Sequence, residues 1–131
     1  MRITADTNVL LRACVADDPV QAQKAVEALE NAERVVISLQ SFCELAWVLG
    51  RHYQTARSDI AATIRALLDT HNVVTDRSAV ESGLAVLEAG GDFADGIIAH
   101  EGRQLGGEVF LSFDKKAVKY FLSQGFSAKL L

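Results

Sequence analysis

The chain has 131 residues, half of them hydrophobic and only one of them proline, and its formal net charge is −4. This length and composition are typical of one globular domain and argue against a disordered chain. No apolar run approaches the roughly 20 residues that a membrane helix needs, and no signal peptide precedes the first apolar segment. We therefore expect a single cytoplasmic domain over residues 1–131 that does not contact a membrane.

Cysteine and histidine usage gives no sign of a disulfide framework or a zinc site. The count alone permits one disulfide, but we expect Cys14 and Cys43 to be free, buried thiols, because a cytoplasmic domain of this size needs no cross-link. His52, His71 and His100 each lack a Cys or His three or four residues away, which is the spacing that zinc sites use. These histidines are expected at the surface or in helix packing.

The first half of the chain alternates short apolar runs with amphipathic segments. Asp18-Pro19-Val20-Gln21 is a strong helix start, with Asp as the N-cap, Pro at the first helical position and Gln at the third. The elements expected here are a strand at 2–5, a helix from 6 through 11, a helix from 18 to about 33, a strand at 35–37, a helix that opens at Ser38 or Gln40-Ser41, and a helix capped by Ser58.

The second half continues the same alternation. Its expected elements are a strand at 72–75, a helix capped by Asp76 and ended by Gly90-Gly91, a helix from 92 to near 106, a strand at 109–111, a helix at 115–122, and a tail at 126–131 that is an edge strand or an ordered extension. Strands that alternate with helices predict an α/β fold with a short parallel sheet covered on both faces.

Four carboxylates, Asp6, Glu44, Asp95 and Asp114, lie where an apolar run ends or a helix begins. In a parallel sheet, strand ends and the helix starts that follow them lie along one edge, so we expect these side chains to meet in one acidic pocket. Two unit charges about 5 Å apart repel by roughly 3 kcal/mol at an effective dielectric of about 20. Such a pocket needs protons or a hard cation, and oxygen ligands suit Mg²⁺ or Mn²⁺.

Asp6 and Glu44 each have an alternative explanation. Asp6 could be only an N-cap, although the adjacent Thr7 and Asn8 carry groups that could steady a carboxylate or a metal-bound water. Glu44 follows Cys43 inside an otherwise apolar helix, where a glutamate is seldom buried unless it is paired or bound to metal. Alternatively, Glu44 lies at the helix edge and reaches solvent.

Asp92 and Asp95 are three residues apart, so both can project near one face at the start of their helix. Asp92 is the better N-cap candidate, which leaves Asp95 in the first turn, where the helix dipole favours negative charge. The following Gly96 costs up to about 1 kcal/mol relative to alanine inside a helix. Close approach at a site explains this glycine, and so does tight packing against a neighbouring helix.

Basic residues follow the last of these acids. Lys115, Lys116 and Lys119 form either a solvated helix face or a basic rim that holds a phosphate backbone. Further candidates for that rim are Arg12, Arg51 and Arg57. The net charge does not decide between these alternatives, because the rest of the chain is neutral once the four acids are set aside. Trp47 and Tyr53 are expected to pack in the core or at its edge and not to stack on bases.

Taken together, these motifs resemble the PIN domain family. The resemblance is carried by Asp6-Thr7-Asn8-Val9-Leu10, by Glu44 in a helix, by Asp92-Phe93-Ala94-Asp95-Gly96-Ile97-Ile98-Ala99, and by Ser112-Phe113-Asp114-Lys115. Their order, spacing and total length are most similar to the VapC-type toxins of bacterial toxin–antitoxin pairs. One departure is Gly96, where the family more often has alanine or another small residue.

The resemblance implies a PIN-like three-layer α/β/α fold and a Mg²⁺-dependent endoribonuclease in which Mn²⁺ can substitute. The implied catalytic and metal-binding residues are Asp6, Glu44, Asp95 and Asp114, with Asp92 as a further metal ligand and Thr7, Asn8 and Ser112 as supporting residues. Implied partners are an RNA substrate, often tRNA, a small antitoxin protein, and a second copy in a homodimer. The implied chemistry is in-line attack on phosphorus by metal-activated water.

Three other classes share part of this pattern. A phosphotransferase of the haloacid-dehalogenase type needs a second Asp two residues after the first, where this chain has Asn8. A receiver module needs a pair of acids after the first strand, where only Asp6 is present, although Asp76 follows the third strand. The third alternative is a non-catalytic PIN-like module that binds RNA or a partner.

Overall fold

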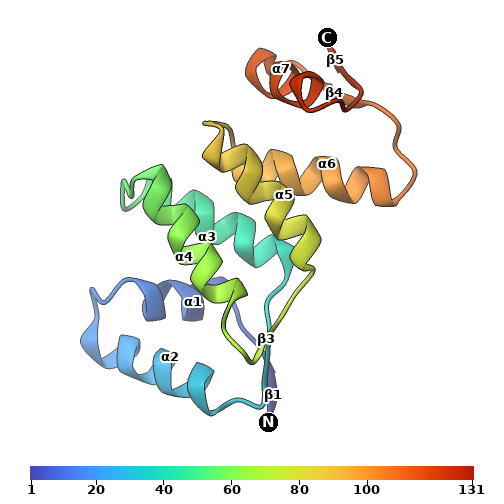
Figure 1. The fold of residues 1–131 in the computed structure, drawn as a ribbon. Helices are drawn as coiled ribbons and strands as arrows, with labels where there is room; N and C mark the ends of the chain where they lie inside the picture. The colour runs from blue at the N-terminus through green and yellow to red at the C-terminus, as the bar shows by residue number, and fades with distance from the viewer. The chain divides into compact units, whose positions relative to one another are not determined.

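The computed structural model describes residues 1–131 as two compact units, Met1–Arg77 and Ser78–Leu131 (Figure 1). Both units combine short parallel strands with helices, and the chain contains seven helices in all. The expected α/β class with a short parallel sheet is therefore confirmed. None of the helices has both the length and the apolar character needed to cross a membrane.

The first unit contains a three-stranded parallel sheet with strand order β1-β2-β3. Its strands are β1 (Arg2–Thr4), β2 (Arg34–Val36) and β3 (Val73–Val74), and its helices are α1 (Thr7–Cys14), α2 (Pro19–Asn31), α3 (Leu39–Arg51) and α4 (Arg57–Leu68). Ile3 is in register with Val35, which pairs in turn with Val73. Because α1 follows β1 and α3 follows β2, both helices begin at the same edge of this sheet.

The second unit contains a two-stranded parallel sheet. Its elements are α5 (Arg77–Glu88, which starts at the unit boundary), α6 (Phe93–Gln104), β4 (Phe110–Ser112), α7 (Lys115–Ser123) and β5 (Ala128–Leu130). Phe110 on β4 lies opposite Ala128 on β5, so the tail of the chain is a strand. Val86, Ala99 and Phe121 form a buried cluster against which Phe110 and Ala128 pack.

Side-chain caps account for most of the predicted helix starts. The Asp18 carboxylate accepts a hydrogen bond from the Gln21 N–H at 3.1 Å and caps α2, as expected. The Ser38 hydroxyl accepts one from the Ser41 N–H at 3.1 Å and caps α3. The predicted cap at Ser58 is wrong, because α4 begins one residue earlier and its N-cap is Ala56, which makes no side-chain bond.

Two predictions of burial are also wrong. Cys14 and Cys43 are free thiols as expected, but Cys14 is exposed and Cys43 is half-buried. Trp47 is 63% exposed and is therefore not a core residue. The helix α3 buries Leu45 and Leu49, and residues two positions apart do not share a helix face, so Trp47 projects away from that core.

Helices α5 and α6 approach each other closely at two glycines. A Cβ atom on Gly96 would lie 2.6 Å from the Cα of Gly83 and would also overlap the carbonyl oxygen of Ser82. A Cβ atom on Gly83 would lie 2.6 Å from the ring of Phe93. Tight packing of α6 against α5 is therefore sufficient to explain Gly96.

We expect Gly96→Ala to lower the free energy of unfolding by about 2 kcal/mol, because overpacking costs roughly 1–3 kcal/mol and outweighs the better helix propensity of alanine. Gly102→Ala, in the same helix, is the matched control, since nothing lies within 4 Å of its added Cβ. That control should be neutral or stabilising by up to about 1 kcal/mol. Urea unfolding followed by circular dichroism measures both variants, and equal stabilities would contradict the packing role of Gly96.

Candidate functional site

The backbone at the start of α1 holds the carboxylate of Asp6. Strand β1 ends at Thr4, and the buried Ala5 extends it by donating its N–H to the Val36 carbonyl at 2.9 Å. Asp6 then caps α1, with its Oδ1 accepting a hydrogen bond from the Thr7 N–H at 2.8 Å. Asp6 is thus an N-cap, but the cap uses only one oxygen. Its Oδ2 accepts no hydrogen bond, and the side chain is exposed.

Thr7 links Asp6 to Glu44. The buried Thr7 hydroxyl donates a hydrogen bond to Glu44 Oε2 at 2.9 Å, while the Thr7 N–H binds Asp6. Gln40, one turn earlier on α3, donates its side-chain amide to Glu44 Oε1 at 3.4 Å. Glu44 is exposed, as the helix-edge alternative predicts. The first unit therefore brings Asp6 and Glu44 together around one threonine.

Asp92 and Asp114 are also N-caps. Asp92 caps α6, with Oδ1 accepting a hydrogen bond from the Ala94 N–H at 3.0 Å. Asp114 caps α7, with Oδ1 accepting from the Lys116 N–H at 2.9 Å and the Ala117 N–H at 3.2 Å. Both residues are exposed, and in both the second oxygen accepts no hydrogen bond.

Asp95 lies in the first turn of α6 and is half-buried. Burial raises the pKa of this carboxyl above its ordinary value, and the negative charges of Asp92 and Asp114 raise it further. The three carboxylates of the second unit therefore repel one another. A cation nearby would relieve this repulsion and favour the ionised form of Asp95.

Ser112 and Lys116 shape the segment around Asp114. The Ser112 hydroxyl accepts a hydrogen bond from the Asp114 N–H at 3.0 Å, which fixes the turn between β4 and α7. Lys116 donates its ammonium group to the Gly90 carbonyl at 2.6 Å. Lys116 therefore ties α7 to the turn that precedes α6 and is not a free rim residue. The other lysines of this helix are exposed, as a solvated face predicts: Lys115 and Lys119.

The acidic side chains of each unit offer the kind of ligand that a hard divalent cation takes. All of the donor side chains present carboxylate or hydroxyl oxygens, and each capping carboxylate keeps one oxygen that no hydrogen bond occupies. No three His, Cys, Asp or Glu side chains surround a common point in the structure. This arrangement is compatible with Mg²⁺, which keeps several waters and commonly takes only one or two carboxylates directly.

A polar cluster that the sequence did not suggest lies at the other end of α1. Asp17 accepts a hydrogen bond from the Tyr53 hydroxyl at 2.9 Å and one from the Arg12 guanidinium at 3.1 Å. The Tyr53 bond, and then the charge of Arg12, lower the pKa of Asp17. Asp17 and Tyr53 are 36 positions apart, so no local spacing signals their contact.

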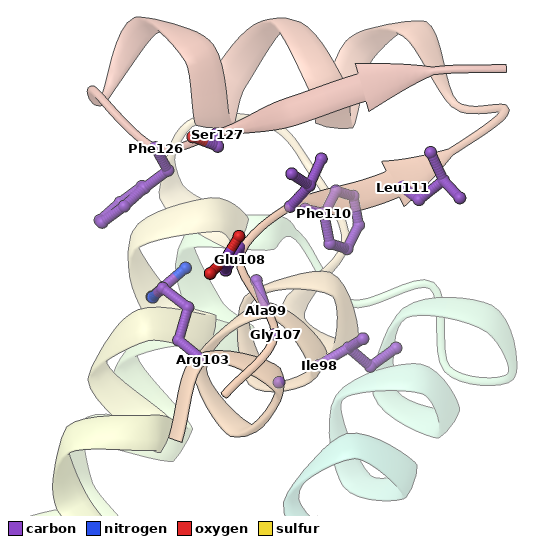
Figure 2. Close-up of a pocket in the computed structure, with 11 residues that line it drawn as sticks. Ile98, Ala99, Arg103, Gly107, Glu108, Phe110, Leu111, Phe126 and Ser127 are labelled. Carbon is purple, nitrogen blue, oxygen red and sulfur yellow. The ribbon is translucent and has the colours of Figure 1, made fainter. Parts of the chain in front are cut away.

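The second unit also contains a hollow of about 220 Å³ beside β4 and α6 (Figure 2). Its lining is largely apolar, and the guanidinium of Arg103 lies 4.2 Å from the centre of the Phe126 ring. Glu108 is the only carboxylate in its wall. None of the predicted site residues lines this hollow, so it is separate from the acidic groups described above.

A comparison with protein families explains why these residues occur in this order. The model of the PIN domain family matches residues 3–120, a span that includes every predicted site residue. A search of curated proteins gave no match. Because the family match covers most of the chain and extends over both units, this chain belongs to the PIN domain family.

Proposed function

We propose that the chain is a Mg²⁺-dependent endoribonuclease whose two units work as one nuclease domain over residues 1–131. PIN domains are generally metal-dependent nucleases. The proposed ligands of the cation are Asp6, Glu44, Asp92, Asp95 and Asp114. The observation that supports this most strongly is Asp95, a half-buried carboxylate whose pKa is raised by burial and by two neighbouring carboxylates. Such a cluster is unfavourable by itself and becomes favourable when a cation binds.

The protein contributes anionic oxygens in fixed positions. Backbone N–H groups orient Asp6, Asp92 and Asp114, and the Thr7 hydroxyl orients Glu44. These hydrogen bonds restrict the side chains and so reduce the reorganisation that cation binding would require. A bound Mg²⁺ or Mn²⁺ would supply Lewis acidity, which makes hydroxide available near neutral pH and offsets charge on phosphate oxygens.

The nucleophile in this proposal is water. Attack by the 2′-hydroxyl without metal would need a pair of acid–base side chains such as two histidines, and the three histidines of this chain belong to three separate segments. His100 lies in α6 with its Nδ1 3.2 Å from the Ser82 hydroxyl, which is helix packing as expected. Hydrolysis by water leaves a 5′-phosphate and a 3′-hydroxyl at the cut.

The biological role that we propose is the toxin of a VapBC-type toxin–antitoxin pair that acts in the cytoplasm. The order and spacing of the four acidic motifs support this role, because they resemble those of VapC-type toxins. The same resemblance supports a structured RNA such as tRNA as the substrate, a homodimer as the active assembly, and a small antitoxin that blocks the acidic groups.

Incubation with bulk tRNA and Mg²⁺ or Mn²⁺ should give discrete cuts that EDTA abolishes. Asp6→Asn, Glu44→Gln, Asp95→Asn and Asp114→Asn should each lower the cleavage rate by about 100-fold or more, because each removes an anionic ligand. Glu27→Gln is the matched control, since Glu27 lies on the exposed face of α2 and bonds only Gln23. Mapping of the new RNA ends completes the measurement.

A 2′,3′-cyclic phosphate at the cut would exclude the water mechanism. Cleavage that Asp6→Asn leaves unchanged would remove Asp6 from the site. Absence of any metal-dependent cleavage would favour the alternative of a PIN-like module that binds RNA or a partner without cutting.

The raised pKa of Asp95 provides a second test, which does not depend on activity. The folded state disfavours the ionised form, so the penalty is full above the folded pKa and vanishes below the unfolded value of about 3.9. Without metal, Asp95→Asn should therefore raise the melting temperature at neutral pH by roughly 1–3 °C, and this gain should shrink towards about pH 4. Added Mg²⁺ should stabilise the wild type more than the variant. Differential scanning fluorimetry measures these shifts.

The matched control for this test is Asp59→Asn, because Asp59 lies in the first turn of α4 as Asp95 does in α6. This control should give no stabilisation, since loss of a first-turn acid removes a favourable interaction with the helix dipole. A lower melting temperature for Asp95→Asn than for the wild type in EDTA would overturn the assignment.

Thr7 is proposed as a positioning residue. Thr7→Val keeps the shape and the backbone N–H but removes the hydroxyl that binds Glu44. We expect the Mg²⁺ concentration for half-maximal activity to rise by about 10- to 100-fold, as is typical when a residue that orients a metal ligand is lost. Thr7→Ser keeps the hydroxyl and should retain the wild-type metal requirement. If the valine and serine variants behave alike, the hydroxyl has no such role.

A further inference from the structure

The first unit has an open hollow of about 490 Å³ between α1 and α2, with a mainly apolar surface that carries four polar side chains. Each of the two helices contributes one amide side chain and one cation to its wall. The lining residues are Asn8, Val9 and Arg12 from α1, and Gln21, Lys24, Ala25 and Ala28 from α2. No carboxylate lines this hollow.

The spacing of these residues places two polar side chains on each side of the hollow. Asn8 and Arg12 are one helical turn apart, about 6 Å along the axis of α1. Gln21 and Lys24 are three positions apart on α2 and so share a face. The small side chain of Ala25 leaves the space between the walls open. Ligand sites commonly occupy about 300–1,000 Å³, so the hollow is large enough for a nucleotide-sized group.

The charges of the hollow suit an anionic strand. Lys24 is exposed and forms no ion pair. Arg12 is paired with Asp17 at 3.1 Å, but both side chains are more than a third exposed, and surface pairs of this kind are weak. A phosphate can therefore compete for Arg12. Arginine, lysine, asparagine and glutamine are also among the side chains that contact nucleic-acid backbones.

We propose that this hollow binds the sugar-phosphate backbone of single-stranded RNA beside the bond that is cut. Arg12 and Lys24 pair with phosphates, and Asn8 and Gln21 donate hydrogen bonds to them. The inference rests on the proposed nuclease function and names where the substrate of that site lies. Asn8 belongs to the first turn of α1, the helix that Asp6 caps, so the hollow begins two residues along the chain from Asp6.

The test measures RNA binding in EDTA, where no metal-dependent cleavage occurs. The probe is a fluorescein-labelled single-stranded RNA of mixed sequence and about 12 nucleotides, titrated with the full-length protein and followed by anisotropy. Lys24→Gln and Arg12→Gln should each raise the Kd by about 3- to 10-fold, and each should reduce the slope of log Kd against log salt by about 0.7, the value for one phosphate contact on a single strand.

Two further variants make the result specific. Arg34→Gln is the matched control, because Arg34 begins β2 at the sheet edge opposite the helix starts, and its Kd should stay within about two-fold of the wild type. Asp17→Asn removes the charge that competes for Arg12 while keeping a partner for Tyr53. This variant should bind the RNA about two-fold more tightly or better, which a purely structural role for Asp17 would not produce.

The outcomes separate this inference from the proposed function. Wild-type affinity in both Lys24→Gln and Arg12→Gln, or no RNA binding by the wild type, would overturn the hollow as the RNA site, and metal-dependent tRNA cleavage would still stand on its own assay. Weakened binding in these variants together with no cleavage in any metal would keep the hollow and overturn the nuclease. Circular dichroism of each variant confirms that it is folded.

Discussion

The placement of the carboxylates depends on the unpaired N–H groups at helix starts. The first N–H groups of a helix have no partner within it, and they carry partial positive charge from the helix dipole. Asp6, Asp92 and Asp114 each bind such groups through Oδ1. These caps stabilise the helices, and each cap uses only one oxygen of its carboxylate. The remaining oxygen of each is left for a ligand.

Asp95 and Glu44 are not N-caps, so neither carboxylate is held by the free N–H groups of a helix start. Asp95 lies within a helix turn, accepts no backbone N–H, and has its pKa raised by burial and by two carboxylates. Glu44 lies further along α3, where no free N–H groups remain, and the side chains of Thr7 and Gln40 hold it instead. Three of the proposed ligands therefore stabilise the helices that they cap, whereas the ionised form of Asp95 is disfavoured in the fold. Residues that lower stability in this way are expected where selection acts on function.

Local sequence patterns predicted the elements and the caps well. Asp18-Pro19 and Asp92 predict where their helices begin, because the hydrogen bond of an N-cap joins residues only two or three positions apart. Side chains that meet across the fold were harder to predict. The contact of Thr7 with Glu44 joins residues 37 positions apart, and the acids could be paired only through the expected edge of a parallel sheet. Gln40 was missed, although it lies one turn before Glu44.

The incorrect prediction for Trp47 and the undecided one for Gly96 also depend on how separate elements pack. Exposed Trp47 carries a large apolar side chain, so composition alone favours the core, but its position on α3 faces away from Leu45 and Leu49. The sequence left two explanations for Gly96, a close approach at a site or tight helix packing. The close approach of Gly83 on the facing helix identifies packing as the explanation. Hydrophobicity and helix period predict which face an element buries. They do not predict which residue of another element comes within contact distance.

Helix α1 carries groups of opposite charge at its two ends. Its N-terminus carries Asp6, where the dipole favours negative charge, and its last turn carries Arg12, where the dipole favours a cation. The proposed metal ligand and the proposed phosphate-binding side chain are therefore carried by the same helix, about 9 Å apart along its axis at 1.5 Å per residue. Because both positions suit the helix dipole, α1 can carry opposite charges at its ends without loss of stability.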